Sequence, residues 1–166
     1  MNSRLPKGLF LLMAAGAGAY FQHYYALLPS VMASHFDARG IPNGWSSKQT
    51  FSEIFAWMTV LGAVLVFGMP KIIAVTPMQL INLPNKQYWL GPEQRAASLE
   101  FLSGWFAWFG CAVYAVIVVA FDYAVQANLH AGEKPNPTWT WYRVGLFGSF
   151  TVVWTIRLYR RFGRAP

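Results

Sequence analysis

The stretch from Phe101 to Phe121 contains no charged residue and is almost wholly apolar. A helix needs about 20 such residues to cross the roughly 30 Å hydrocarbon layer of a bilayer. Three further apolar stretches meet or approach that length: Gly8–Leu28, Ile54–Met69, which Pro70 closes, and one from about Trp139 to Tyr159. This pattern predicts an all-α membrane protein with four transmembrane helices in an antiparallel bundle.

The composition supports a membrane protein over a soluble one. Hydrophobic residues make up 55% of the 166 residues and charged residues only 11%, against roughly a quarter charged in soluble domains. The net charge of +7 could indicate a nucleic-acid partner. However, the Lys and Arg residues cluster at the ends of the apolar stretches. We therefore expect the lipid bilayer, and no nucleic acid, as a partner.

The spans divide the chain into helices and loops. We expect a single domain, residues 1–166, with helices at about 8–28, 52–69, 92–124 and 139–159, an outer loop 29–50 and an inner loop 70–91. The alternative for the first span is a cleavable signal peptide, because a basic start precedes an apolar run containing "AAGAGA". Apolar and aromatic residues continue through Leu28, so we expect an uncleaved helix.

The distribution of positive charge predicts the orientation. In a four-helix topology nine Lys and Arg residues fall on one side, and the other side holds Arg39, Lys48, Lys134 and Arg143. Positive residues favour the cytoplasmic side. Both termini and the 70–91 loop should therefore be cytoplasmic, while the 29–50 loop and a second loop, about 126–138, should face outward.

The 29–50 loop contains strong turn and capping signals. "DARG" predicts a turn in which Gly40 adopts positive φ, and Asn43-Gly44 predicts a second tight turn. Thr50 and Glu53 match a capping box at the start of the next helix. We therefore expect an ordered outer loop.

This loop also carries the residues best suited to bind a ligand. His35 and Asp37 lie within one tripeptide, Trp45 and Lys48 follow, and His23 lies one or two turns below the outer surface. A zinc site needs three or four ligands, and the spacing matches no metal motif. The alternative is structural, with His35 bonding the loop backbone and Asp37 capping its own turn. We expect no metal, no cofactor and no catalytic residue.

Charged residues near the membrane fall at the helix ends. Asp122 should close the third helix and Arg143 open the fourth, so we expect an ion pair between them to lower the cost of charge near lipid. Glu100 and Arg157 could pair at the inner end.

Two motifs resemble a bacterial multi-pass membrane domain of unknown function, which is also found near the start of the immunity protein against the sporulation-delaying peptide toxin. The outer motif comprises Leu28-Pro29, His35-Phe36, Gly40, Pro42, Trp45 and Ser47-Lys48. The inner motif, "LPNKQYWLGPEQR" at 83–95, contains Asn85, Tyr88, Trp89, Glu93 and Arg95. The resemblance implies a protein of the bacterial inner membrane and no established common activity.

The inner motif has physical expectations of its own. Pro92 and Glu93 suit the first turn of the third helix. Tyr88 and Trp89 should hold the loop at the inner membrane interface, and residues 71–83 should lie along the membrane surface or form a groove for a partner.

Three functional classes remain open. A binding or sensing protein would use the outer loop as its recognition site, and the resemblance to the immunity protein favours it. An accessory subunit would dock on a larger membrane complex, through a protein partner or as a homo-oligomer. An enzyme is the least expected, because convergent catalytic groups are few.

Overall fold

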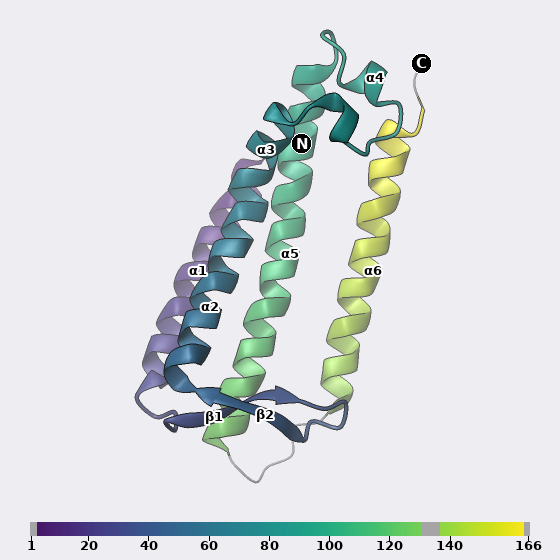
Figure 1. Ribbon diagram of the computed structural model, residues 1–166. Coiled ribbons are helices and arrows are strands. Elements are labelled where there is room, and N and C mark those ends of the chain that lie inside the picture. Colours follow the sequence, from purple (N-terminus) through teal and green to yellow (C-terminus); the bar gives the residue numbers. More distant parts are fainter. Residues whose placement is uncertain (1–2, 131–136, 165–166) are drawn as a thin grey trace.

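The computed structural model describes residues 3–130 and 137–164. In chain order the elements are α1 (Arg4–Tyr25), β1 (Val31–Phe36), β2 (Pro42–Ser47), α2 (Lys48–Ala63), the π-helical turn η1 (Val64–Gly68), α3 (Met69–Val75), the 3-10 turn η2 (Met78–Leu80), α4 (Lys86–Trp89), α5 (Arg95–Leu129) and α6 (Pro137–Phe162). The strands lie at one end of the molecule, and the start of α1 and the end of α6 lie at the other (Figure 1).

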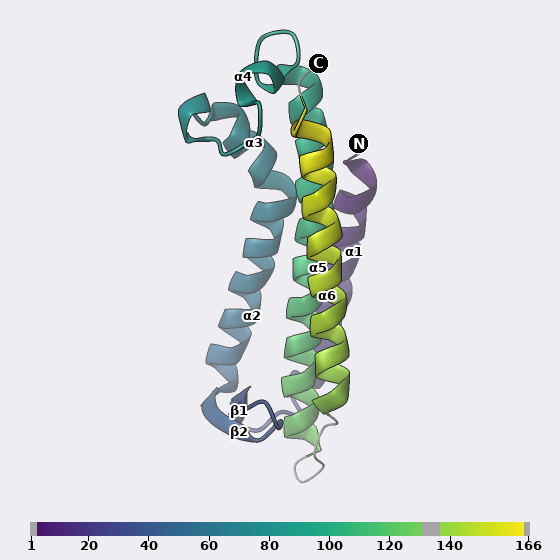
Figure 2. The same ribbon diagram turned by 90° about the vertical axis from the view of Figure 1, so that its right-hand side faces the viewer.

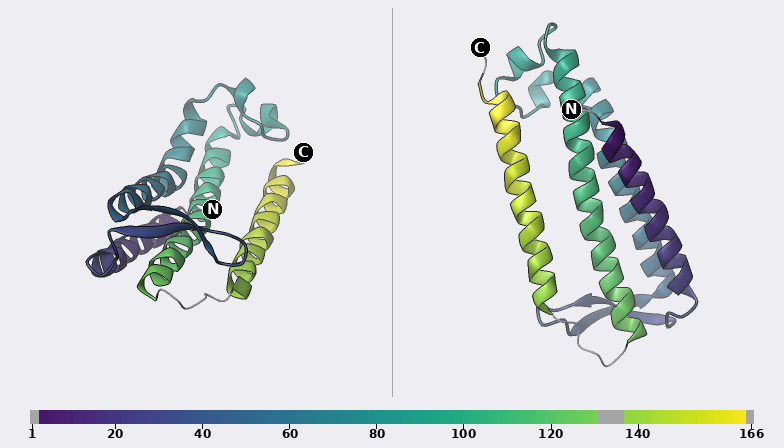
Figure 3. Two further views of the ribbon diagram at one scale, coloured as in Figure 1. Left: turned by 60° about the horizontal axis from the view of Figure 1, so that its bottom comes forward. Right: turned by 180° about the vertical axis from the view of Figure 1, so that it is seen from behind.

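The long helices are arranged around α5. This helix contacts α1, α2, η1, α3 and α6, and Figure 3 shows it between α1 and α6. Its apolar residues are spread over all sides of the helix, as expected of a helix with neighbours on several faces. Figure 2 shows α3 and α4 folded over the end opposite the strands.

Among the described residues, two helical segments are long and apolar enough to cross a membrane. They are Lys48–Val75, which joins α2, η1 and α3, and Arg95–Leu129, which is α5. The structure therefore supports membrane association of these two segments by their length and composition.

The prediction that Pro70 ends the second helix is wrong. Proline lacks an amide hydrogen and its ring clashes with the preceding helical turn, which normally breaks an α-helix. Here the backbone widens into the π turn η1 directly before it, with the Met69 amide donating to the Val64 carbonyl. The wider turn accommodates the proline, and the helix continues to Val75.

The start of this helix also differs from the prediction. The helix begins at Lys48, and Ser47 is its N-cap, with the Ser47 Oγ accepting from the Thr50 amide at 3.0 Å. Glu53 does not reach back to cap the helix but accepts from Gln49 at 3.1 Å. The predicted capping box is therefore wrong, because Ser47 lies at the required spacing from Thr50 and takes the capping position.

The segment 29–50 is ordered, but it is not a loop in an all-α protein. β1 and β2 form an antiparallel hairpin, with Val31 opposite Ser47 and Ala33 opposite Trp45, and the register becomes irregular between Ala33 and Phe36. Asn43 and Gly44 lie within β2, so the second predicted turn is wrong. The single turn at Asp37–Gly40 is enough to reverse the chain.

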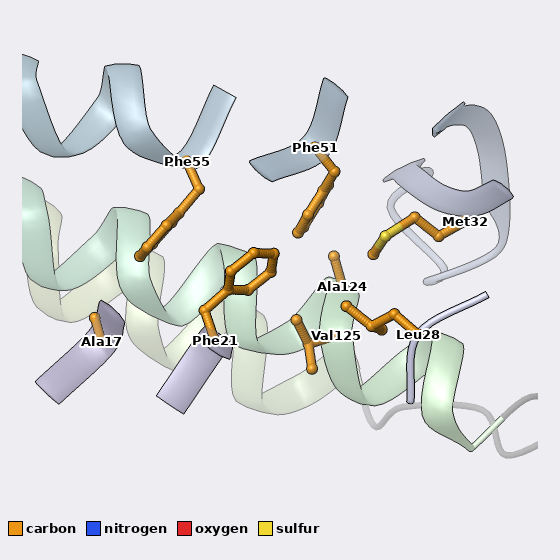
Figure 4. Packing of buried hydrophobic residues seen from close by; sticks show 8 residues of the cluster. All are labelled: Ala17, Phe21, Leu28, Met32, Phe51, Phe55, Ala124 and Val125. Carbon is orange, nitrogen blue, oxygen red and sulfur yellow. The ribbon is translucent and has the colours of Figure 1, made fainter. Parts of the chain in front are cut away.

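The hairpin is anchored in an apolar cluster that it shares with three helices. Met32 of β1 is 1% exposed, and Figure 4 shows it beside Phe51, Leu28 and the α5 residues. Phe21 of α1 lies against Phe51 and Phe55 of α2, with ring centroids 5.9 and 5.3 Å apart. The full set is Ala17, Phe21, Leu28, Met32, Phe51, Phe55, Ala124 and Val125. The hairpin is thus an integral part of the folded core.

Two tryptophans join α6 to α5. The rings of Trp105 and Trp154 are stacked, with centroids 3.3 Å apart. Each indole N–H donates to the other residue's backbone carbonyl, at 3.4 and 3.2 Å. The pair satisfies both indole donors in an apolar setting, where an unpaired donor is costly.

Candidate functional site

The hairpin turn is built around Asp37. Its Oδ1 accepts from the backbone amides of Arg39 at 2.8 Å and Ile41 at 2.9 Å, and its Oδ2 pairs with the Arg39 guanidinium at 3.1 Å. The Ile41 amide, followed by the Arg39 amide and guanidinium, lowers the pKa of the Asp37 carboxyl group. Gly40 takes the predicted positive φ, at 78°. Asp37 therefore caps its own turn.

His35 lies on the exposed part of β1. Its Nδ1 is 3.1 Å from the Ser34 Oγ, and Gly44 lies opposite it across the hairpin. A Cβ atom at Gly44 would be 3.0 Å from the His35 Cβ, so glycine is what allows the two strands to approach here. Across the described residues no group of three His, Cys, Asp or Glu side chains converges in a metal-binding arrangement.

Side chains from two neighbouring helices fix the hairpin to the bundle. The Asn128 side-chain amide of α5 accepts from the Ala33 N–H and donates to the Ala33 C=O, both at 2.8 Å. The Lys48 ammonium donates to the carbonyls of Tyr25 and Leu28 at 3.4 Å and lies 4.7 Å from the Tyr25 ring centroid. Lys48 thus stabilises the Tyr25 carbonyl at the end of α1 and the Leu28 carbonyl in the segment that follows it. Of the predicted ligand-binding residues, it has the clearest structural role.

The hairpin exposes large apolar side chains beside polar ones such as His35 and Arg39. Trp45 is 63% exposed and Val31 62%, with Ile41 beside the turn also exposed. His23 lies apart from the hairpin on α1, exposed and edge-on to Tyr24. The hairpin therefore presents His35 and Trp45 on a fixed framework, while Asp37 and Lys48 serve mainly to build that framework.

The predicted ion pair between Asp122 and Arg143 is not formed. Asp122 instead accepts a hydrogen bond from the Tyr20 hydroxyl of α1, and the Gln126 amide donates to the same hydroxyl at 2.6 Å. Arg143 is exposed on α6. Asp122 faces α1, and a neutral hydroxyl donor on that neighbouring helix satisfies the carboxylate.

The inner motif caps the end of α6. Asn85, in a left-handed conformation with φ 49°, donates its side-chain amide to the Phe162 carbonyl at 2.9 Å. The Trp89 indole donates to the same carbonyl at 3.1 Å, and the Arg161 guanidinium lies 4.3 Å from the centroid of the Trp89 ring. Trp89 is 6% exposed, so its ring is buried in this contact, and its predicted place at the membrane interface stays a prediction.

The other residues of the inner motif have different surroundings. Arg95 donates to the Ala74 carbonyl of α3 at 2.7 Å, which joins the start of α5 to the end of α3. Tyr88 and Glu93 are exposed. α5 begins at Arg95, three residues after Pro92, because the residues from Gly91 form a separate turn in which the Gln94 and Arg95 amides donate to the Gly91 carbonyl.

Sequence reasoning missed Asn128, Tyr20 and Gln126. Asn128 follows Ala124 by one helical turn in an apolar run, and Gln126 follows Asp122 in the same way. Polar side chains near the end of an otherwise apolar helix, Asp122, Gln126 and Asn128, were the available signal. Their partners on α1 and β1 are about 100 residues away in the sequence, so the contacts themselves could not be read from it.

Part of this site is similar to a known family of domains. No curated protein and no solved structure matches the chain. A family model matches residues 9–61, a segment that includes most of α1, the whole hairpin and most of α2, whereas the inner motif lies outside it. Residues 9–61 are therefore similar to the domain described as "Domain of unknown function (DUF1648)", which confirms the expected resemblance to an uncharacterised domain family.

Proposed function

We propose that this protein is a four-pass protein of the bacterial inner membrane that binds or senses a ligand through its outward-facing hairpin. The hairpin would be the recognition site, and the end that carries α4 and both termini would lie in the cytoplasm.

Three features support the proposed topology. α1, α5, α6 and the joined segment Lys48–Val75 run alongside one another (Figure 1). The hairpin and the inner motif lie at opposite ends of them. Most Lys and Arg residues belong to the end with the inner motif, as the positive-inside rule requires of a cytoplasmic face.

The observation that carries the binding proposal is the combination of a fixed base and an exposed apolar surface in the hairpin. Met32 is buried in the core and Ala33 is bonded to Asn128, so the strands are held in place. Trp45 and Val31 nonetheless remain more than half exposed. A preorganised surface with an exposed aromatic residue loses little conformational entropy on binding.

Site-specific photocrosslinking in intact cells tests this proposal. A benzophenone amino acid would replace His35 in the hairpin or, as a control, Trp57, which is 69% exposed on α2. We expect a discrete crosslinked species from position 35 and only diffuse lipid adducts from position 57. The same adduct pattern from both positions would contradict a recognition role for the hairpin.

The second candidate is an accessory subunit of a larger membrane complex. It is favoured by the large exposed side chains on the helices, such as Trp57 on α2 and Leu146, which is 75% exposed on α6. This function predicts discrete protein adducts from positions 57 or 146, together with co-purification at a fixed ratio in mild detergent. The photocrosslinking experiment therefore separates the two functions.

A further inference from the structure

The net charge of the protein lies at the end that carries the inner motif. Nine of the 13 Lys and Arg residues belong to segments at this end, and Glu93 and Glu100 are the acidic residues of the same segments. The segments toward the hairpin hold four basic and four acidic residues, so their charges cancel. The charge of +7 therefore belongs to one end of the molecule.

Some of these cations are bonded within the fold. The Lys86 ammonium donates to two backbone carbonyls, at 3.0 and 3.1 Å, and the Arg95 guanidinium donates to a third at 2.7 Å. The Arg161 guanidinium lies 4.3 Å from the centroid of the Trp89 ring. These three side chains stabilise the inner end of the protein and are not available to a ligand.

Three arginines at the end of α6 are not used in this way. Arg157, Arg160 and Arg164 are exposed, and among the described residues no carboxylate or carbonyl binds their guanidinium groups. Basic side chains near the end of a helix often bind its last carbonyls. Here the inner motif supplies the donors to the Phe162 carbonyl. The three guanidinium groups are therefore free to bind an anion.

The arginines continue an apolar face of α6. Val153, Ile156 and Arg160 follow the three- and four-residue spacing that places side chains on one side of a helix. Arg157 lies one turn beyond Val153, and Arg164 comes directly after the last turn. Val153 and Ile156 are each 51% exposed, and Figure 3 shows α6 at the edge of the molecule. This face is thus apolar along the helix and cationic at its end.

We propose that this face binds an anionic phospholipid of the inner leaflet, with the phosphate at Arg157, Arg160 and Arg164 and the acyl chains along Val153 and Ile156. Clusters of basic residues at the cytoplasmic end of a membrane helix attract anionic headgroups, and the guanidinium fork matches a phosphate group. A soluble phosphate compound would leave the apolar part of the face uncovered, whereas a phospholipid matches both parts. The inference rests on the four-pass topology proposed above and not on the recognition role of the hairpin.

The general preference of positive residues for the cytoplasmic side does not account for this arrangement. That preference concerns the number of Lys and Arg residues in the inner segments. It does not require three unbonded arginines to gather on the exposed face of one helix. The proposal therefore predicts a lipid preference that is specific to this face and is not shared by other cations at the same end.

Photoactivatable lipids test the proposal. The full chain would be placed in phosphatidylcholine nanodiscs that contain a small fraction of phosphatidylglycerol or of phosphatidylcholine with a diazirine in the acyl chain, and mass spectrometry would map the adducts. We expect the phosphatidylglycerol probe to label α6 around Val153 and Ile156 with about tenfold the yield of the phosphatidylcholine probe. An excess of soluble glycerol phosphate should not reduce this labelling.

Two double variants assign the preference to the arginines. Arg157→Gln/Arg160→Gln should lower the phosphatidylglycerol yield to that of phosphatidylcholine. The matched control, Lys7→Gln/Lys71→Gln, removes the same charge from the same end of the molecule, on α1 and α3, and should leave the preference nearly unchanged. Near-ultraviolet circular dichroism, which reports the stacked tryptophans of α5 and α6, checks that both variants keep α6 packed.

The possible failures are distinguishable. Equal labelling of α6 by the two lipids, equal losses from the two double variants, or competition by glycerol phosphate would overturn the lipid site and leave the four-pass topology standing. The absence of α6 adducts from either lipid would show that this helix does not contact the bilayer, and would overturn both the site and the topology.

Discussion

At the scale of single residues, several side chains with the chemistry of ligands are used inside the protein. The Asp37 carboxylate closes the hairpin turn, and the Lys48 ammonium binds carbonyls at and just after the end of α1. Asn85 and Trp89 both donate to the Phe162 carbonyl at the end of α6. Charged and polar groups at the ends of these helices satisfy backbone groups that have no helical partner. His35 and Trp45 remain exposed, and under the proposed function they are the residues available for recognition.

Asp37 predicts how the turn responds to acid. Because amide donors lower the pKa of its carboxyl group in the folded protein, the stabilisation is complete above the ordinary pKa of about 3.9. It declines as the pH falls below that value and is lost once the pH passes the lowered pKa. The amide chemical shift of Ile41, followed by NMR, should therefore change with a midpoint below about 3.9. In Asp37→Asn this transition should disappear, and a midpoint above the ordinary value would contradict the bonding described.

Asn128 predicts how strongly the hairpin is held. Asn128→Leu leaves the N–H and C=O of Ala33 without a partner, which should lower the free energy of unfolding by about 1–3 kcal/mol. Denaturation in detergent micelles measures the loss, and faster hydrogen exchange at Ala33 locates it. Asn43→Leu is the matched control, because Asn43 is exposed and should change stability by less than about 0.5 kcal/mol. Similar losses from the two variants would show that Asn128 is not the anchor.

At the scale of elements, α5 and the π turn η1 approach closely because Gly110 has no side chain. A Cβ atom there would lie 2.6 Å from the Val66 Cγ2 and 3.2 Å from the Val66 backbone nitrogen. Val66 is fully buried and cannot move away without shifting the turn. The same π turn allows the helix to continue past Pro70. The contact with Gly110 and the length of the apolar segment Lys48–Val75 therefore depend on each other.

Gly110→Ala tests the close approach. The added methyl group should lower the free energy of unfolding by about 1–3 kcal/mol, because it overpacks a well-filled contact. Gly18→Ala on α1 is the control: nothing lies within 4 Å of its added Cβ, and alanine favours a helix over glycine by up to about 1 kcal/mol. In detergent, Gly110→Ala should therefore lower the free energy of unfolding, whereas Gly18→Ala should raise it. If Gly110→Ala leaves the free energy of unfolding unchanged, η1 shifts at little cost to make room for the added methyl group.

At the scale of the whole molecule, the proposed topology predicts which positions are accessible from each side of the membrane. Ala38 lies in the hairpin turn and Gln87 in α4, and both are exposed. Cys111, the only cysteine of the chain, would be replaced by serine so that the maleimide reacts only with the introduced thiol. A membrane-impermeant maleimide should then label Ala38→Cys in intact cells and Gln87→Cys only after lysis. Labelling of both positions from the outside would place the two ends of the molecule in one compartment and contradict the topology.

The sequence predicts some parts of this fold well and others poorly. The apolar runs located all four long helices to within a few residues at most ends, and "DARG" located the turn. The strands were missed because β1 and β2 are short and do not alternate cleanly between apolar and polar residues. The Asp122 contact was predicted with the wrong partner, because the nearest opposite charge in the expected topology was Arg143, whereas the folded chain brings Tyr20 to it.

The sequence by itself determined that this chain has long apolar helices, a turn at Asp37–Gly40 and an uneven distribution of positive charge, because each of these depends on neighbouring residues or on composition. The tertiary structure alone decided that the outer segment pairs as a hairpin and that Asn128 joins its first strand to α5. Those features arise from contacts between residues as much as 95 positions apart, and only the packing of α1, α2 and α5 brings such residues together.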